Sequence, residues 1–336
     1  MQIYRTILRR AWQILWQHAW LWPLGLFAAL AGNGGEYSAL AISSERVATQ
    51  ISAWQTLQTN LKTDQVNFVW EGIKNTFSHS PVLVIWLLFV LIVVAILVLW
   101  IIIVSQASLI QATGKIDAGE STNFTKTTSA AVKHFWPIFF LNLLAKFFIY
   151  LLLAVAFLPF LIALLIHPQT NWNFNLLVII SFIISAPLSL IISFVLKYAA
   201  IYIVLAKEKW WSALAKAINL FFRNWLVSLE MAAILFVINF ALSMVVFLLI
   251  PNTILLEVYV LFTGFNWITL FRVLPTFILF VAAGTWFATF QYVAWTLLYR
   301  RLEGDGIIPK LIRLTEHLPP TINYWLNKNP LDLGKK

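Results

Sequence analysis

The sequence predicts an all-α integral membrane protein with six transmembrane helices and additional amphipathic helices at the membrane surface. Hydrophobic residues make up 61% of the 336 positions and charged residues only 11%, whereas soluble domains carry about 25% charged residues. Long uncharged stretches alternate with short polar segments. The 17 tryptophans and 27 phenylalanines suit extensive lipid contact and aromatic belts at the interfaces. A soluble globular core is therefore excluded.

Composition also restricts the chemistry. The chain has no cysteine, which excludes disulfides, thiolate nucleophiles and Cys-based metal sites. Its five histidines are scattered, without the His-Glu-x-x-His pair of a metalloprotease or the Gly-x-Ser-x-Gly turn of a serine hydrolase. The net charge is +10, but nucleic-acid binding needs a basic face on a soluble module. We therefore expect a non-enzymatic protein with no cofactor, no metal and no nucleic-acid partner.

The predicted spans follow from length, since a helix needs about 20 apolar residues to cross the hydrocarbon core. The clearest span follows Pro81 and contains no charged residue. The six predicted spans cover residues 14–31, 82–104, 136–166, 174–196, 226–250 and 271–299. Some are longer than a bilayer requires, which indicates tilt or interfacial ends.

The orientation follows from the positions of lysine and arginine, which are enriched in cytoplasmic connections. Most of the 23 basic residues lie in the N-terminal tail, in the connections 105–135 and 197–225, and after residue 299. The connection 251–270 holds only Glu257 as a charged residue. We therefore predict a protein of the prokaryotic inner membrane with both termini in the cytoplasm.

Two polar segments flank this arrangement. The external loop 32–80 has apolar residues at helical spacing, which favours an amphipathic helix on the membrane or capping the bundle, with a ligand-binding cap as the alternative. In the tail 306–336, apolar and basic residues alternate after Pro309, which predicts a cytoplasmic helix that is attracted to anionic lipid and ends at Pro319-Pro320. Residues 1–305 would then form the six-span membrane domain.

The N-terminus has a second interpretation. Arg9-Arg10, an apolar stretch and an Ala-x-Ala site at Ala29-Leu30-Ala31 also resemble a secretory signal peptide. Cleavage there would leave five spans and an external N-terminus. A retained span is favoured because tryptophans such as Trp12 and Trp16 are unusual in a signal peptide, and because two later spans begin with the same pattern.

That pattern is a short amphipathic, basic segment that ends in tryptophan, and we call it a lead-in segment. The three lead-in segments are AWQILWQHAW (11–20), TTSAAVKHFW (127–136) and KAINLFFRNW (216–225). Alignment on the tryptophans brings a basic side chain to the same position in each. The predicted interfacial anchors are Trp20, Trp136, Trp225, His18, His134 and Arg223. Each segment predicts a helix at the water–lipid boundary, with its basic group in water and its indole at headgroup level.

The ends of the second, fourth and sixth spans also resemble one another. These exit motifs read QASLI (106–110), YAAIY (198–202) and YVAWT (292–296), and a basic residue follows each at the same distance. Together with the lead-in segments they divide the chain into three helical hairpins, at about 11–115, 127–207 and 216–301. Such parallel repeats would be related by an axis along the membrane normal. Convergence on interface chemistry is the alternative explanation.

Charged residues inside a membrane are candidates for function. Lys146 lies within the third span and Glu230 within the fifth. The two could pair or line a wet cavity, or each could be a hydrogen-bonded charge that fixes the helix register. A further polar stripe recurs every four residues in the fourth span and consists of Ser181, Ser185, Ser189, Ser193 and Lys197. It is either a polar track or a packing surface whose hydroxyls bond back to the preceding turn.

In the sixth span, Gly284 and Ala288 provide the small-xxx-small spacing of a close helix contact. Thr285 and Thr289 lie next to them. We expect this segment to pack against a neighbouring helix.

Several short stretches resemble a loose group of six-span prokaryotic proteins that includes the membrane domain fused to glycerophosphoryl diester phosphodiesterases. The resemblance rests on three stretches, LRRAW (8–12) with WLWPLG (20–25), Leu109-Ile110 with Gly119-Glu120, and LYRRL (298–302). It covers about residues 1–305. It implies a six-span membrane domain without catalytic residues, because the phosphodiesterase chemistry of that group belongs to a separate soluble barrel.

These observations predict a multi-pass scaffold or accessory domain that contacts membrane lipid, a partner protein or a second copy of itself. The alternative is a transporter or channel for a small solute or lipid, with a polar track at Lys146, Glu230 and the serine stripe. An intramembrane lipid enzyme ranks last, since the chain offers no acid–base pair for it.

Overall fold

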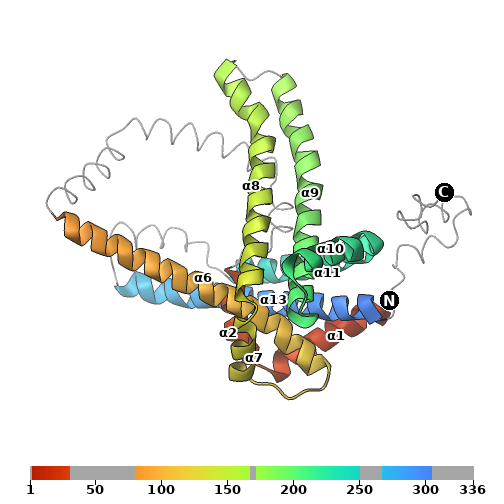
Figure 1. Ribbon diagram of the computed structural model, residues 1–336. Helices are drawn as coiled ribbons and strands as arrows, with labels where there is room; N and C mark the ends of the chain where they lie inside the picture. Colours follow the sequence, from red (N-terminus) through yellow and green to blue (C-terminus); the bar gives the residue numbers. More distant parts are fainter. Residues whose placement is uncertain (1, 31–79, 167–171, 250–266, 305–336) are drawn as a thin grey trace, which may run out of the picture. The chain divides into compact units, whose positions relative to one another are not determined.

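The computed structural model describes residues 2–30, 80–166, 172–249 and 267–304 (Figure 1). Within these ranges the chain forms helices joined by short turns, and no strand occurs there. The helices are α1 (Gln2–Gln17), α2 (Leu21–Ala29), α6 (Pro81–Asp117), α7 (Phe124–Val132), α8 (Phe135–Ile166), α9 (Trp172–Leu205), α10 (Trp210–Arg223), α11 (Trp225–Leu249) and α13 (Trp267–Gly304). The predicted all-α class is confirmed. The predicted external loop 32–80 and tail 306–336 lie outside the described residues, apart from Ser80.

Five of the described helices are long and apolar enough to cross a membrane. The segments that meet this test are Val84–Asp117, Phe135–Leu152, Pro187–Leu205, Trp225–Val246 and Phe277–Gly304. They fall in α6, α8, α9, α11 and α13, which are the second to sixth predicted spans. The chain is thus an all-helical membrane protein.

The first predicted span, residues 14–31, is not one continuous helix. The helix α1 ends at Gln17, and α2 begins at Leu21 and has nine residues, about 13 Å at 1.5 Å per residue. Pro23 explains the interruption, because it has no N–H to bond to Ala19 and its ring would clash with that carbonyl in a continuous helix. In the first turn of α2 the missing N–H costs nothing. The residues predicted as the first span thus form parts of two helices, with a break at residues 18–20.

The three predicted lead-in segments share one local arrangement, a helix, an interruption of one to three residues, and a second, apolar helix. We call each break a corner. The corners separate α1 from α2 at residues 18–20, α7 from α8 at residues 133–134, and α10 from α11 at Asn224. The three tryptophans of the alignment lie at or within two residues of the start of α2, α8 and α11.

The shortest corner is held by its own hydrogen bonds. The backbone N–H of Asn224 donates to the carbonyls of Leu220 and Phe221, at 3.1 and 3.0 Å. The Asn224 side chain also donates to Leu220, and the Ser228 hydroxyl donates to the Asn224 carbonyl at 3.0 Å. Asparagine at this position thus pairs its backbone N–H, its side-chain amide N–H and its carbonyl where α10 ends and α11 begins.

The chain divides into two compact units, residues 34–101 and the remainder. The described part of the first unit is Ser80 and the beginning of α6. Its side chains from Ile85 to Trp100 are apolar on every side of the helix and exposed. A helix of this kind needs an apolar solvent around it, which fits a membrane span.

The exit motifs form much of the core of the main unit. Side chains that are at most 2% exposed include Ala107, Leu109, Ile110, Ala199, Ala200, Ile201, Val293, Ala294, Trp295 and Thr296. Around these motifs, α8 and α10 pack against α9, whereas α1 and α2 pack against α13. Figure 1 shows α8 and α9 side by side along their length. The small residues common to the three motifs therefore serve close packing between helices.

The closest helix approach involves Gly25 of α2. A Cβ atom added to Gly25 would lie 1.8 Å from Thr289 Oγ1 and 3.0 Å from the Thr285 carbonyl oxygen of α13. By contrast, a Cβ on Gly284 would meet no described atom within 4 Å. The expected close contact on α13 thus lies at its threonines, opposite a glycine of α2, and Gly284 does not take part in it.

The end of α6 is set by Gly119, whose φ is +81°. The N–H of Glu120 donates to the Lys115 carbonyl at 3.0 Å, and the N–H of Gly119 donates to the Ile116 carbonyl at 3.1 Å. These are the two bonds of a Schellman cap, which needs a left-handed residue and so favours glycine. The cap places Asp117 in the last turn of α6, where it reaches two other helices.

Candidate functional site

Two hydrogen bonds join the first residue of an exit motif to the hairpin that follows it in the chain. Gln106 of α6 accepts from the Asn142 amide of α8 at 2.8 Å. Tyr198 of α9 and Ser228 of α11 share a buried hydrogen bond of 2.7 Å. Both pairs bridge helices, so these polar residues position the bundle.

Glu230 of α11 is half-buried and accepts a hydrogen bond of 2.5 Å from the Tyr4 hydroxyl of α1. The predicted partner, Lys146, lies on an exposed face of α8 beside Leu143 and Phe147. Glu230 therefore links α11 to α1. This is the role expected of a hydrogen-bonded charge that fixes the helix register. The pairing of Lys146 with Glu230 stays a prediction.

The serine stripe of α9 becomes more buried toward its end. Ser185 and Ser189 are half-buried and Ser193 is only 7% exposed, while the side chain of Ser181 lies outside the described residues. Lys197 is half-buried and its Nζ lies 4.9 Å from the centre of the Trp295 ring. The stripe thus runs into the packed core and ends in a cation–π contact, which is more favourable in a desolvated setting.

Many buried hydroxyls of the bundle are satisfied within their own helix. Side chains that donate to the carbonyl four residues earlier include Ser108 (2.7 Å), Thr113 (2.8 Å), Thr289 (2.8 Å), Thr296 (2.8 Å) and Ser228 (3.0 Å). This back-bonding removes the cost of burying a hydroxyl. These groups therefore suit helix packing and do not require a water-filled path beside them.

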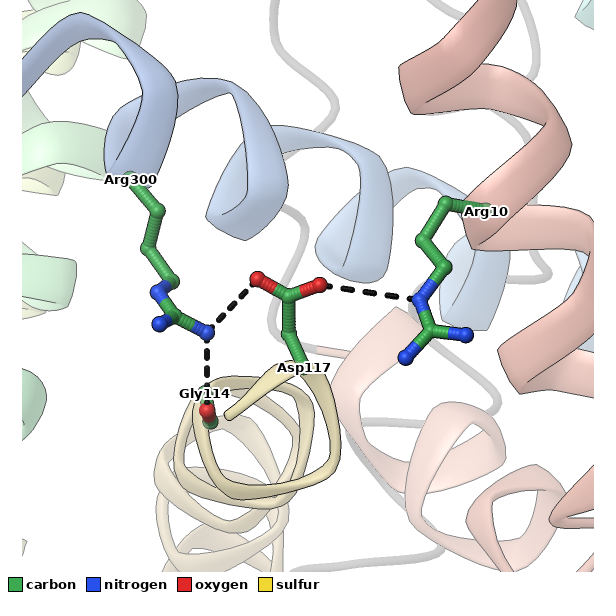
Figure 2. A network of polar contacts seen from close by, with 4 residues as sticks. All are labelled: Arg10, Gly114, Asp117 and Arg300. Carbon is green, nitrogen blue, oxygen red and sulfur yellow. Dashed lines mark hydrogen bonds and ion pairs between the residues drawn. The ribbon is translucent and has the colours of Figure 1, made fainter. Parts of the chain in front are cut away.

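An ionic network that the sequence did not lead us to predict joins three helices (Figure 2). The Asp117 carboxylate of α6 lies between two guanidinium groups, 2.6 Å from Arg300 of α13 and 3.6 Å from Arg10 of α1. Arg300 also donates to the Gly114 carbonyl at 3.0 Å. The sequence contains paired arginines at 9–10 and 300–301 and an acidic residue, Asp117, in a connection that also holds basic residues, but no pattern in it links the three positions.

A second ion pair lies at the start of α10. The Glu208 carboxylate accepts from Lys216 at 2.5 Å and from the Ser212 hydroxyl at 2.8 Å. The hydrogen bond from Lys216, followed by that from Ser212, lowers the pKa of Glu208 below its ordinary value of 4.5. Because Glu208 stands just before the first turn of α10, its charge also complements the positive end of the helix.

The predicted interfacial anchors lie at the corners with different exposure. Trp136, Trp225 and Arg223 are exposed, whereas Trp20, His18 and His134 are half-buried. Aromatic and basic residues thus gather at all three corners, as expected for a membrane interface.

The chain matches no protein-family model, no curated protein and no solved structure. The resemblance to the six-span group remains an expectation. Within the described ranges, no group of three or more His, Asp or Glu side chains is placed to hold a metal ion.

The surroundings of the His134 imidazole perturb its titration. Burial of the ring, together with the positive charges of Lys207 and Lys133, lowers its pKa below the ordinary value of 6.5. Lys133 is the neighbouring residue at the corner before α8, and Lys207 follows the end of α9, a helix that packs against α8.

This shift predicts a pH dependence of stability. As pH falls through 6.5, His134 gains a proton in the unfolded chain before it does so in the folded one, so the folded state loses stability until the pH reaches the lowered pKa. We expect the apparent melting temperature in mild detergent to fall more for the wild type than for His134→Gln between about pH 7.5 and about pH 5.5. Equal falls for both proteins would contradict the assignment.

Proposed function

We propose that this chain is a non-enzymatic, multi-pass scaffold or accessory domain of the prokaryotic inner membrane, which contacts lipid or a partner protein. The observation that carries the proposal is the set of three corners, at each of which a short helix precedes an apolar helix. This arrangement suits a protein whose surface helices and spans together shape a membrane contact. The buried hydroxyls that bond back within their own helices support a packed interior.

The proposal includes six spans, the first over residues 14–31, where α2 lies, and it places both termini in the cytoplasm. Six spans agree with the distribution of basic residues, because each cytoplasmic connection then holds the lysines and arginines. The same topology is implied by the resemblance to the six-span group.

We also propose that the three hairpins are true repeats. The bonds Gln106–Asn142 and Tyr198–Ser228 start at the same position of two exit motifs, and each leads to the next hairpin. The third hairpin contacts the first through α13 and α2. The first hairpin thus contacts the second, the second contacts the third, and the third contacts the first, which supports a cyclic arrangement of the three hairpins.

The orientation can be tested directly, because a chain without cysteine accepts single cysteines with no background. Ser80 and Ser121 are exposed and lie just before and just after α6. We expect a membrane-impermeant maleimide to label Ser80→Cys in intact spheroplasts and Ser121→Cys only after permeabilisation. Labelling of both, or the reverse pattern, would reject the proposed topology.

The scaffold role can be tested against transport in reconstituted vesicles. We expect no proton flux into pyranine-loaded vesicles and no scrambling of fluorescent phosphatidylethanolamine above that of protein-free vesicles. We expect purification in mild detergent, followed by native mass spectrometry, to retain a lipid or protein partner.

Transport is the second candidate, favoured by the half-buried charged residues Glu230 of α11 and Lys197 of α9, because charges within membrane helices are candidates for function. Flux or scrambling that is present in the wild type and lost in Glu230→Gln would support it and would replace the scaffold proposal.

A further inference from the structure

The helix α1 has two faces of different chemistry. Its buried side carries Tyr4, Ile7, Ala11 and Ile14, which pack into the bundle, where α1 contacts α13. Its exposed side carries Arg5, Arg9, Trp12 and Trp16, at helical spacings of four, three and four residues. One stripe of α1 thus presents two cations followed by two indoles away from the bundle.

The indoles of this stripe are held in place by other tryptophans. The ring centre of Trp12 lies 5.9 Å from that of Trp16 and 5.4 Å from that of Trp286 of α13, and Trp16 lies 5.5 Å from Trp22 of α2. The contacts to Trp286 and Trp22 are edge-to-face, a favourable geometry for aromatic pairs. The exposed aromatic surface is therefore fixed in orientation.

The helix α10 has an apolar stripe on each of two sides. The buried stripe is Ala213, Ala217, Leu220 and Phe221, on a helix that packs against α9.

The outward stripe of α10 is Trp211, Ile218 and Phe222, which are 62, 40 and 48% exposed. Lys216 and Arg223 are exposed beside it. A helix that packs on one protein face needs only one apolar stripe, so the second must be covered by something other than α9.

The third short helix, α7, differs. Its exposed residues include Thr125, Lys126 and Ser129, and its exposed apolar side chains, Phe124 and Val132, stand at its two ends. An aromatic or aliphatic stripe at helical spacing is therefore specific to α1 and α10.

We propose that the outward faces of α1 and α10 bind acidic phospholipids in one leaflet of the membrane, and that the outward face of α7 stays in water. The inference rests on the proposed membrane-scaffold function and names the lipid class that this scaffold selects. Its basis is charge complementarity combined with position. Corners of three residues and one residue connect α1 to α2 and α10 to the spanning helix α11, so both short helices are held at the membrane surface.

The chemistry of the two stripes fits this ligand. The guanidinium and ammonium groups can pair with the phosphate and the extra negative charge of an acidic headgroup. The indoles and the aliphatic side chains can enter the boundary between headgroups and acyl chains. Neither α1 nor α10 contains an acidic residue, so contact between these faces in two copies of the chain would bring like charges together. Lys216 also pairs with Glu208, which precedes α10.

The first experiment measures where the helices lie. A spin label is attached to Ile218→Cys on α10 and, as a matched control on another short helix, to Ser129→Cys on α7, in vesicles of phosphatidylcholine and phosphatidylglycerol. We expect the Ile218 label to be accessible to oxygen and shielded from a water-soluble nickel chelate, and the Ser129 label to show the reverse. An Ile218 label accessible to the chelate, or shielded from both reagents by protein, would overturn the proposal.

The second experiment measures lipid selectivity. Spin-labelled phosphatidylglycerol and phosphatidylcholine report, through their motionally restricted fractions, the relative association of each lipid with the protein. We expect phosphatidylglycerol to be preferred, and the preference to fall by up to about fivefold per neutralised basic residue in Lys216→Gln/Arg223→Gln. High salt should weaken it in the wild type.

The matched control for selectivity is Lys126→Gln/Lys133→Gln at α7, which removes the same charge and should leave the preference unchanged. Equal association of the two lipids with the wild type would overturn the inference while the scaffold proposal stands. Failure of the cysteine-labelling topology would instead reject the membrane arrangement on which both depend.

Discussion

Replacement of Gly25 by alanine is expected to destabilise the folded bundle strongly, because α2 and α13 leave no room for a side chain at this position. The added Cβ would lie 1.8 Å from Thr289 Oγ1 and 3.0 Å from the Thr285 carbonyl. Thr289 is fully buried, so α2 and α13 would have to separate or distort. Overpacking of this kind costs about 1–3 kcal/mol, which should appear as a clear drop in apparent melting temperature in mild detergent.

Two variants make the Gly25 prediction specific. Gly284→Ala adds the same methyl group where it meets no described atom, so its melting temperature should equal or slightly exceed that of the wild type because alanine favours helix. Thr289→Ala in the Gly25→Ala background removes the nearest clashing atom and should restore part of the lost stability. A Gly25→Ala protein as stable as Gly284→Ala would show that α2 and α13 do not meet as described.

Neutralisation of Asp117 is expected to have the second-largest effect. Asp117→Asn keeps the shape of the side chain but removes the negative charge that Arg10 and Arg300 share. The two guanidinium groups would then repel each other with no carboxylate between them. The Asp117 side chain is 25% exposed and its partners 35 and 40%, so solvent screening limits the loss in unfolding free energy to about 1–2 kcal/mol.

The variant Glu208→Gln provides a comparison for Asp117→Asn within the same protein. Glu208→Gln removes an exposed ion pair that joins neighbouring segments of the chain, and such pairs contribute little to stability. We therefore expect a lower apparent melting temperature for Asp117→Asn than for Glu208→Gln, with the difference narrowing at high salt. Equal melting temperatures for the two variants at low salt would contradict a bridging role for Asp117.

The helical class and the positions of five membrane helices could be predicted from the sequence because apolar length alone determines them. The corners were also predictable, because a basic residue and a tryptophan close to an apolar run carry a local signal. The break at residues 18–20 lies within the predicted first span, and hydropathy does not show it, because hydropathy averages over Pro23, whose effect depends on backbone geometry.

The contacts between helices could be predicted less well. Gly25 and Thr289 are far apart in the chain, and no sequence pattern around either residue predicts which helix it contacts. For the same reason close packing was expected at Gly284, which has the right spacing within α13 but faces no described helix. Asp117 was overlooked because acidic residues at helix ends are common on protein surfaces. Its bridging role depends on tertiary contacts with Arg10 and Arg300, which lie on other helices.

The contacts of α1 and α2 with α13 have a consequence for biosynthesis. Ribosomes make the chain from α1 toward α13, so α10 can dock on α9 soon after both have emerged. The helices that carry Ile7, Ala11 and Gly25, however, pack against α13, which is the last helix described. These residues therefore stay uncovered until α13 has been synthesised. During translation their apolar surface is open to other membrane proteins or chaperones, and the bundle can close only once α13 has been inserted.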